Sequence, residues 1–149
     1  MRRTSLRMRI VFSYRRRMAV ELTLPDGVRA TAQRRAVLRA VGESPGSFTV
    51  AELHERARRI EPGLGLATTY RTLELLRSNG GVHPLLGEGR PTYVRCRPEH
   101  HHHLVCTSCG AVEETELCAA PSEAELQRHH GFRPAAHELD IYGTCRRCA

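Results

Sequence analysis

Lysine and tryptophan are absent from this sequence, and all 23 of its basic residues are arginines. Long apolar runs are absent too. No stretch comes near the roughly 20 residues that a membrane helix needs, and residues 10–12 are too short for the apolar part of a secretion signal. We therefore expect a cytoplasmic protein without a membrane segment, whose six cysteines stay reduced.

The net charge of +7 has a local origin. Residues 1–17 carry seven arginines and no acidic residue, so the rest of the chain is neutral overall. Within that rest, residues 18–98 hold twelve arginines and eight acidic residues, whereas residues 99–149 hold four and eight. A basic half followed by an acidic half favours a DNA-binding head on a metal-binding body. We expect residues 1–24 to form a basic, disordered arm, unless translation starts at Met18.

The segment 96–109 contains seven candidate metal ligands in fourteen residues. Two of them, Cys106 and Cys109, form a CxxC pair, and a second CxxC pair, Cys145 with Cys148, lies near the end of the sequence. Four thiolates in two such pairs are typical of the closed tetrahedral shell of a structural zinc ion. A redox-active CxxC is the alternative, but it needs a helix starting at the motif. Here Gly110 and a strand-like segment, 111–115, follow, which favours zinc.

Four consecutive histidines, His100–His103, precede the first CxxC pair. Side chains alternate along a β-strand, so in a strand His101 and His103 would face one side, and His100 and His102 the other. One strand could therefore supply two different metal sites.

The first half of the chain has the pattern of three short helices followed by a hairpin. Apolar spacing predicts the helices at about 31–41, 49–60 and 67–78, with Thr49 and Glu52 forming a capping box at the second. The hairpin is predicted from strands at 82–86 and 91–95 around a turn at 87–89. Together these elements predict a winged helix-turn-helix domain over residues 25–97.

The third helix is the expected DNA-reading element. Its spacing predicts that Tyr70, Leu73 and Leu76 face the core, while Thr68, Thr69 and Arg71 remain outside. Hydroxyl groups beside an arginine can contact phosphates and base edges. The alternative for an arginine-bearing helix is a solvated surface without a partner.

The second half, residues 98–149, is predicted to be a small mixed sheet with one helix. Ser122 and Glu125 predict a capping box for a helix that ends near Gly131, and alternation over 136–142 predicts a strand. About 50 residues are too few for a self-sufficient core, so a structural zinc ion and a dimer partner are expected supplements. The fold class is α+β, with a winged-helix domain followed by a small α/β dimerisation domain.

These residues resemble the ferric uptake regulator family and, within it, the zinc uptake regulator branch. The resemblance rests on Arg29–Arg34, Gly65–Leu73, His100–Cys109 and His137–Cys148. It implies homodimers whose winged helices bind palindromic double-stranded DNA when a divalent metal occupies a site between the two domains. Such proteins repress genes of metal uptake.

The resemblance also assigns roles to matched residues. Structural zinc would be held by Cys106, Cys109, Cys145 and Cys148. The sensory site would be formed by His83, Cys96, His101 and His103. The DNA contacts would come from Arg29, Arg34, Thr68, Thr69, Tyr70 and Arg71. A thiolate with imidazoles suits zinc better than iron or manganese. His83 has an alternative as an exposed histidine of the wing.

A third site is implied at His100, His102 and His137, but the acidic fourth ligand is missing, because the corresponding position falls at Ala120 or Pro121. Glu123 or Cys118 could substitute, or the site could be vacant. We expect Cys118 to be a partly buried small residue rather than a ligand.

The predicted function is a metal-responsive transcriptional repressor with zinc as co-repressor, at least two zinc ions per chain, and no small-molecule substrate. A regulator of the same family that senses iron, manganese or peroxide is the first alternative. A zinc-dependent enzyme is the second. A nucleobase deaminase needs a proline before its CxxC pair, and Val105 and Thr144 occupy those positions here. We therefore expect no enzymatic activity.

Overall fold

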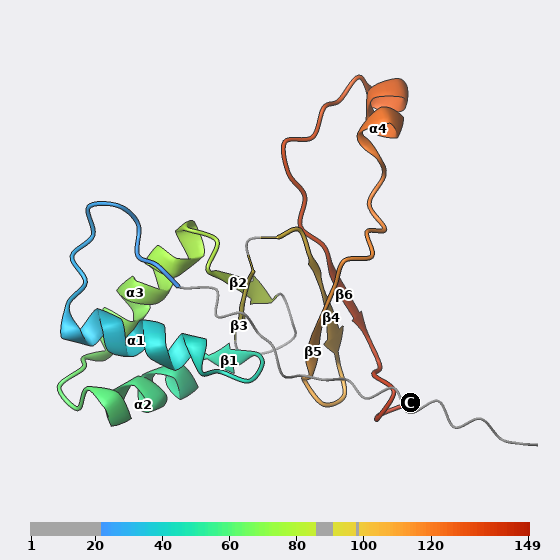
Figure 1. The fold of residues 1–149 in the computed structure, drawn as a ribbon. Coiled ribbons are helices and arrows are strands. Elements are labelled where there is room, and N and C mark those ends of the chain that lie inside the picture. Colours follow the sequence, from blue (N-terminus) through green and yellow to red (C-terminus); the bar gives the residue numbers. More distant parts are fainter. Residues whose placement is uncertain (1–21, 86–90, 98) are drawn as a thin grey trace, which may run out of the picture.

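The computed structural model describes residues 22–85, 91–97 and 99–149, which form two domains (Figure 1). In chain order the elements are α1 (Ala32–Gly42), β1 (Phe48–Thr49), α2 (Val50–Ile60), α3 (Leu66–Ser78), β2 (Val82–Leu85), β3 (Thr92–Arg95), β4 (His102–Cys106), β5 (Val112–Thr115), α4 (Glu123–His130) and β6 (Asp140–Gly143). The expected basic arm lies mostly, and the hairpin turn at 87–89 entirely, outside the described residues. The α+β class is confirmed.

The first domain is built around a core shared by its three helices. Thr49 and Glu52 form the predicted capping box at α2: the Glu52 carboxylate accepts from the Thr49 backbone N–H at 2.8 Å, and the Glu52 N–H donates to the Thr49 hydroxyl at 3.2 Å. The core side chains are Val37, Val41, Phe48, Leu53, Leu73 and Leu76, all at most 2% exposed. All of them except Phe48, which lies on β1, belong to the apolar patterns that predicted the helices.

The predicted faces of α3 were wrong at two positions. Thr69 is fully buried, whereas Tyr70 is 54% exposed. Thr72 is fully buried too, and its hydroxyl donates to the Thr68 carbonyl at 2.7 Å. The Thr69 hydroxyl is hydrogen-bonded to Nδ1 of His54 on α2 at 2.8 Å. Apolar spacing could not predict that this face of α3 is buried, because Thr69 and Thr72, which lie on it, are polar residues whose hydroxyls are hydrogen-bonded inside the protein.

The wing is a three-stranded antiparallel sheet in the order β1-β3-β2. Its hairpin pairs Val82 with Arg95 and Leu85 with Thr92, which confirms the predicted strands. Cys96, which directly follows β3, is anchored as well, because its N–H donates to the Gly81 carbonyl at 3.1 Å. This hydrogen bond holds Cys96 in a defined position where the first domain leads into the second.

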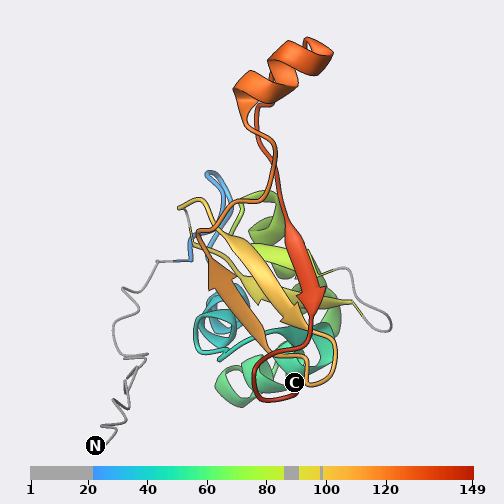
Figure 2. The same ribbon diagram turned by 90° about the vertical axis from the view of Figure 1, so that its right-hand side faces the viewer.

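The second domain holds a three-stranded sheet in the order β5-β4-β6, in which β6 runs parallel to β4 (Figure 2). His103 is the register partner of Asp140, and Cys106 that of Gly143. The strand predicted over 136–142 is shorter than expected. Strand β4 begins only at His102, and its pairing with β6 begins at His103 and Asp140. Residues 136–139 therefore have almost no strand beside them with which to pair.

Helix α4 stands away from the sheet at the end of two long segments (Figures 1 and 2). Its predicted start is confirmed by the capping box of Ser122 and Glu125, and its end by Gly131, whose φ of 64° is the left-handed conformation that glycine adopts freely. No residue of α4 is buried within the chain. In the described part of the protein, no helix has the length and apolar character needed to cross a bilayer.

Candidate metal centres and DNA-binding surface

The four cysteines of the two CxxC pairs come together at one end of the second sheet. Their sulfur atoms all lie within 4.8 Å of one another. The parallel pairing of β4 with β6 explains this, because it places the turn after Cys106 beside the turn that follows Gly143. All four are free thiols, so no disulfide competes with a metal ion. This cluster fits the all-sulfur tetrahedral shell of structural zinc.

Backbone groups already stabilise the thiolate form within this cluster. The Cys145 N–H donates to the Cys106 sulfur at 3.3 Å. This and further backbone hydrogen bonds from Cys109 and Ser108 lower the pKa of Cys106 to about 6. Hydrogen bonds from backbone N–H groups to the sulfurs are the surroundings that a zinc-bound thiolate needs.

A second cluster lies where the two domains meet and comprises Cys96, His101 and His103, which we call the junction cluster. Nε2 of His103 lies 4.0 Å from the Cys96 sulfur. Nδ1 of His101 donates to the Glu99 carbonyl at 2.7 Å, while its Nε2 is buried without a hydrogen-bond partner among the described residues. A buried imidazole nitrogen with a free lone pair, close to a thiol, fits a metal ion.

The thiol of Cys96 is protonated in the absence of a metal ion. Burial raises its pKa to about 12, and the carboxylates of Glu114, Glu138 and Asp140 add to the shift. A divalent cation at the junction cluster would replace this proton and balance the surrounding negative charge.

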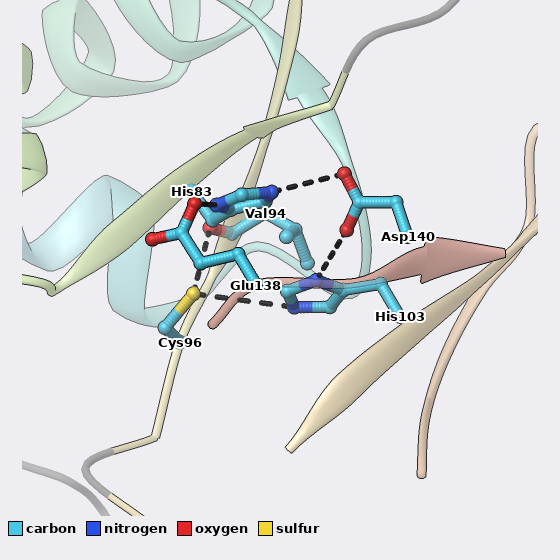
Figure 3. A network of polar contacts seen from close by, with 6 residues as sticks. All are labelled: His83, Val94, Cys96, His103, Glu138 and Asp140. Carbon is cyan, nitrogen blue, oxygen red and sulfur yellow. Dashed lines mark hydrogen bonds and ion pairs between the residues drawn. The ribbon is translucent and has the colours of Figure 1, made fainter. Parts of the chain in front are cut away.

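His83 does not join the junction cluster. Its ring is stacked on that of His103, with centroids 5.1 Å apart. Its Nε2 donates to Oδ2 of Asp140 at 3.0 Å, and its Nδ1 lies 3.6 Å from Oε2 of Glu138 (Figure 3). His83, His103 and Asp140 thus form an adjacent group of candidate ligands that shares His103 with the junction cluster. The role of His83 as fourth ligand stays a prediction.

Asp140 is a candidate site residue that sequence reasoning missed. It was seen only as a polar residue on one face of a strand. The one available signal was that Glu138 and Asp140 share this face, seven and five positions before Cys145 of the last CxxC pair. Its proximity to His83 and His103 depends on the pairing of β6 with β4, a long-range contact that local patterns do not reveal.

A cavity of about 290 Å³ opens at the junction. It is lined by residues of both domains, among them Arg77, His83, Cys96, His101, His103 and Asp140. Since the wing supplies His83 and Cys96 while the second domain supplies the others of the two candidate groups, the position of one domain relative to the other determines the shape of this site.

The third cluster comprises His100, His102, Cys118 and His137. Nε2 of His100 lies 3.0 Å from Nε2 of His102, and the Cys118 sulfur lies 3.2 Å from Nε2 of His137. His102 is fully buried, and its burial lowers its pKa, so the ring is a neutral potential ligand. The four histidines alternate between this cluster and the junction cluster, as predicted, and metal binding at each cluster stays a prediction.

The expected partial burial of Cys118 was wrong, because the residue is exposed. Its sulfur lies close to the three histidines, so Cys118 is the candidate for the fourth ligand there. Glu123 is not part of this cluster. Local patterns could not decide between Glu123 and Cys118, because the segment 116–121 has no regular structure to set the direction of its side chains.

The predicted DNA-binding residues divide into exposed and buried ones. Tyr70 and Arg71 are exposed on α3, and Thr68 is half-buried beside them. Arg34 lies in the first turn of α1 and Arg29 three residues before the helix, and Nη1 of Arg34 donates to the Arg29 carbonyl at 2.7 Å. Thr69 is buried against His54, so its hydroxyl cannot reach DNA from this position.

Comparison with known proteins gives a consistent result. The model of the Ferric uptake regulator family matches residues 25–142. A zinc uptake regulation protein of Mycobacterium tuberculosis is 40% identical over 124 residues, which cover 82% of this chain and 95% of that protein. A ferric uptake regulation protein of Bacillus subtilis is 37% identical over 124 residues, covering 79% and 83%. The solved structure of a ferric uptake regulator from Francisella tularensis with iron has the same fold, with a TM-score of 0.66, 21% identity, and coverage of 85% and 98%.

Proposed function

This chain belongs to the ferric uptake regulator family, and from that premise we propose that it is a zinc-responsive transcriptional repressor. The observation that carries the proposal is the junction cluster of Cys96, His101 and His103, placed between a winged helix and a second domain that has its own four-cysteine cluster. A metal ion at the first site would report on metal supply, and one at the second would stabilise the fold.

The donor set favours zinc as the sensed metal. Zinc accepts thiolate and imidazole ligands in tetrahedral sites, whereas manganese prefers oxygen donors. The relationship to a protein named zinc uptake regulation protein, at 40% identity, supports the same choice. The iron-responsive alternative keeps some support from the relative named ferric uptake regulation protein. It does not explain a cysteine at the junction.

The junction geometry supplies a means of switching. A metal ion changes a conformational equilibrium only by binding one conformation more tightly than the other. Ligand candidates from the wing and from the second domain line one cavity, so the ion would favour the arrangement that brings them together. By linkage, DNA that selects the same arrangement would raise the zinc affinity by the same factor.

DNA would be bound by the first domain. Tyr70 and Arg71 are the exposed candidates for base contacts, Thr68 completes that surface, and Arg29 and Arg34 supply positive charge at the start of α1. Thr69 is not among the proposed DNA contacts, because it is buried and its hydroxyl is hydrogen-bonded to His54.

A homodimer is the proposed assembly, and it accounts for the apolar surface of the second domain. Leu117 is 82% exposed and Phe132 58% exposed, on the two segments that carry α4, and Leu104 of β4 is 37% exposed. Helix α4 has no buried residue within the chain. A symmetric partner that covers these residues would provide the missing core, and two winged helices related by a two-fold axis would match a palindromic operator.

The proposal does not include an enzymatic activity. The matched relatives carry the names of regulators, which supports the prediction that this chain is neither a zinc hydrolase nor a deaminase. We propose a cytoplasmic location, which follows from the role in transcription and from reduced zinc-binding cysteines.

The test is a comparison of metals in DNA binding. Duplexes that bind the protein in the presence of zinc are first selected from a random pool. Binding is then titrated against free zinc, iron(II) and manganese(II) in metal buffers, under reducing conditions. We expect zinc to act at the lowest free concentration. A response to iron or manganese at a lower free concentration than zinc would refute the assignment.

A further inference from the structure

Asp140 connects two histidines that belong to different domains. Its Oδ1 accepts a hydrogen bond from Nδ1 of His103 at 3.1 Å, and its Oδ2 accepts one from Nε2 of His83 at 3.0 Å. Figure 3 shows the carboxylate reaching both rings. His83 lies on β2 of the wing, whereas Asp140 and His103 are register partners on β6 and β4. One side chain therefore bridges the domains through both of its oxygens.

The hydrogen bond to His103 determines which ring nitrogen is free. An ionised carboxylate can only accept, so the proton of the neutral ring must lie on Nδ1. Nε2 then carries the lone pair, and it is this atom that faces the Cys96 sulfur at 4.0 Å. His103 is only 4% exposed, so water cannot readily replace Asp140 as the partner of Nδ1.

We propose that Asp140 is a positioning residue of the junction cluster: it fixes His103 as a ligand through Nε2 and ties that ring to His83 on the wing. A carboxylate behind a metal-binding histidine orients the ring and raises its basicity, and its removal typically lowers metal affinity by about 10- to 100-fold. Here the same carboxylate also holds the wing. Its loss should therefore weaken the coupling between zinc and DNA as well as the binding of zinc.

Glu138 provides a matched control. It carries the same charge and lies two residues before Asp140, with Oε2 3.6 Å from the other ring nitrogen of His83. It is 81% exposed, however, and no hydrogen bond joins it to His103 among the described contacts. Loss of negative charge near the cavity is thus common to Asp140→Ala and Glu138→Ala, whereas loss of the acceptor for His103 is specific to the first.

The experiment uses the full-length protein with the four-cysteine site loaded with zinc. Nitrogen-15 NMR of the imidazoles reports the tautomer of His103 before zinc is added to the junction, and competition with a chromophoric chelator measures the zinc affinity there. We expect His103 to be protonated on Nδ1 in the wild type and in Glu138→Ala, but not held in that form in Asp140→Ala. Zinc affinity should fall about 10- to 100-fold in Asp140→Ala relative to Glu138→Ala.

A second pair, Asp140→Asn and Glu138→Gln, keeps side-chain size in case the alanine variant fails to fold. Asparagine has one acceptor oxygen where two imidazole donors need two, so Asp140→Asn should still bind zinc more weakly than Glu138→Gln. The inference is overturned if His103 of the wild type carries its proton on Nε2. It is also overturned if every Asp140 variant that folds has the same zinc affinity as its matched Glu138 variant.

This inference rests on the proposed function only in taking the junction cluster as the sensory site. The two can fail separately. If the wild type binds zinc at the junction with His103 protonated on Nδ1 but shows no zinc-dependent DNA binding, the function is wrong and the role of Asp140 stands. If DNA binding follows zinc equally in Asp140→Ala and the wild type, the role of Asp140 is wrong and the function stands.

Discussion

The backbone N–H of Cys145 donates a hydrogen bond to the sulfur of Cys106, 3.3 Å away, although 39 positions separate the two residues in the chain. The Cys145 sulfur itself lies 3.7 Å from that of Cys109. The second CxxC pair is therefore joined to the first through both backbone and side chain. This relationship supports the proposed structural role of the four cysteines at the end of the sheet, away from the junction between the domains.

Replacing Cys145 by serine should unfold the second domain. Three thiolates would remain in a shell that needs four, and the binding energy of structural zinc is part of the folding free energy. We expect loss of the dimer in sedimentation experiments and loss of zinc in elemental analysis. Cys118→Ser is the control for folding and dimerisation, since it removes an exposed cysteine outside this cluster. It should remain a dimer and keep the zinc of the four-cysteine cluster, and any metal that it loses should come from the third cluster. A dimeric Cys145→Ser protein with full zinc content would contradict the assignment.

Arg71→Ala should weaken operator binding by about 1–3 kcal/mol if the guanidinium contacts a base edge, because that is the usual cost of losing one such contact. Dimerisation and zinc content should not change. Arg39→Ala is a suitable control, since Arg39 is an exposed arginine of the same domain that pairs with Glu43 at 2.8 Å. Equal binding of all sequences by Arg71→Ala and wild type would exclude the contact. A uniform loss with a flatter salt dependence would indicate a phosphate contact instead.

Cys118→Ala should remove metal from the third cluster alone. The sulfur lies 3.2 Å from Nε2 of His137 and completes a set of four candidate ligands with the three histidines. Cobalt(II) substitution can follow this site, because a bound thiolate contributes a charge-transfer band that a serine or alanine at position 118 cannot. We expect the band assigned to this site to disappear while the four-cysteine site keeps its metal. An unchanged spectrum would show that Cys118 is not a ligand.

Most local features of this fold could be predicted because short-range patterns encode them. The capping boxes at Thr49 and Ser122 and the left-handed Gly131 depend only on residues within one turn. The alternation of His100–His103 between two clusters follows from the geometry of one extended segment. These predictions needed no knowledge of distant contacts.

The rest could not be predicted, since it depends on long-range pairing or on polar groups in the core. The approach of Asp140 to His103 requires the parallel register of β6 with β4, and that of Cys118 to His137 requires two irregular segments to meet. Thr69 is buried because His54 on another helix satisfies its hydroxyl. In each case the partner lies beyond the range of a periodic pattern.

The most direct measurement of the central claim is DNA binding by Cys96→Ser as a function of free zinc, with zinc content and oligomeric state determined on the same sample. If Cys96 belongs to the sensory site and the four-cysteine cluster to the fold, the variant should remain a folded dimer that retains structural zinc but no longer responds to added zinc. Binding of the selected operator at the free zinc concentration of the wild type would contradict the account. Unfolding of the kind expected for Cys145→Ser would contradict it equally.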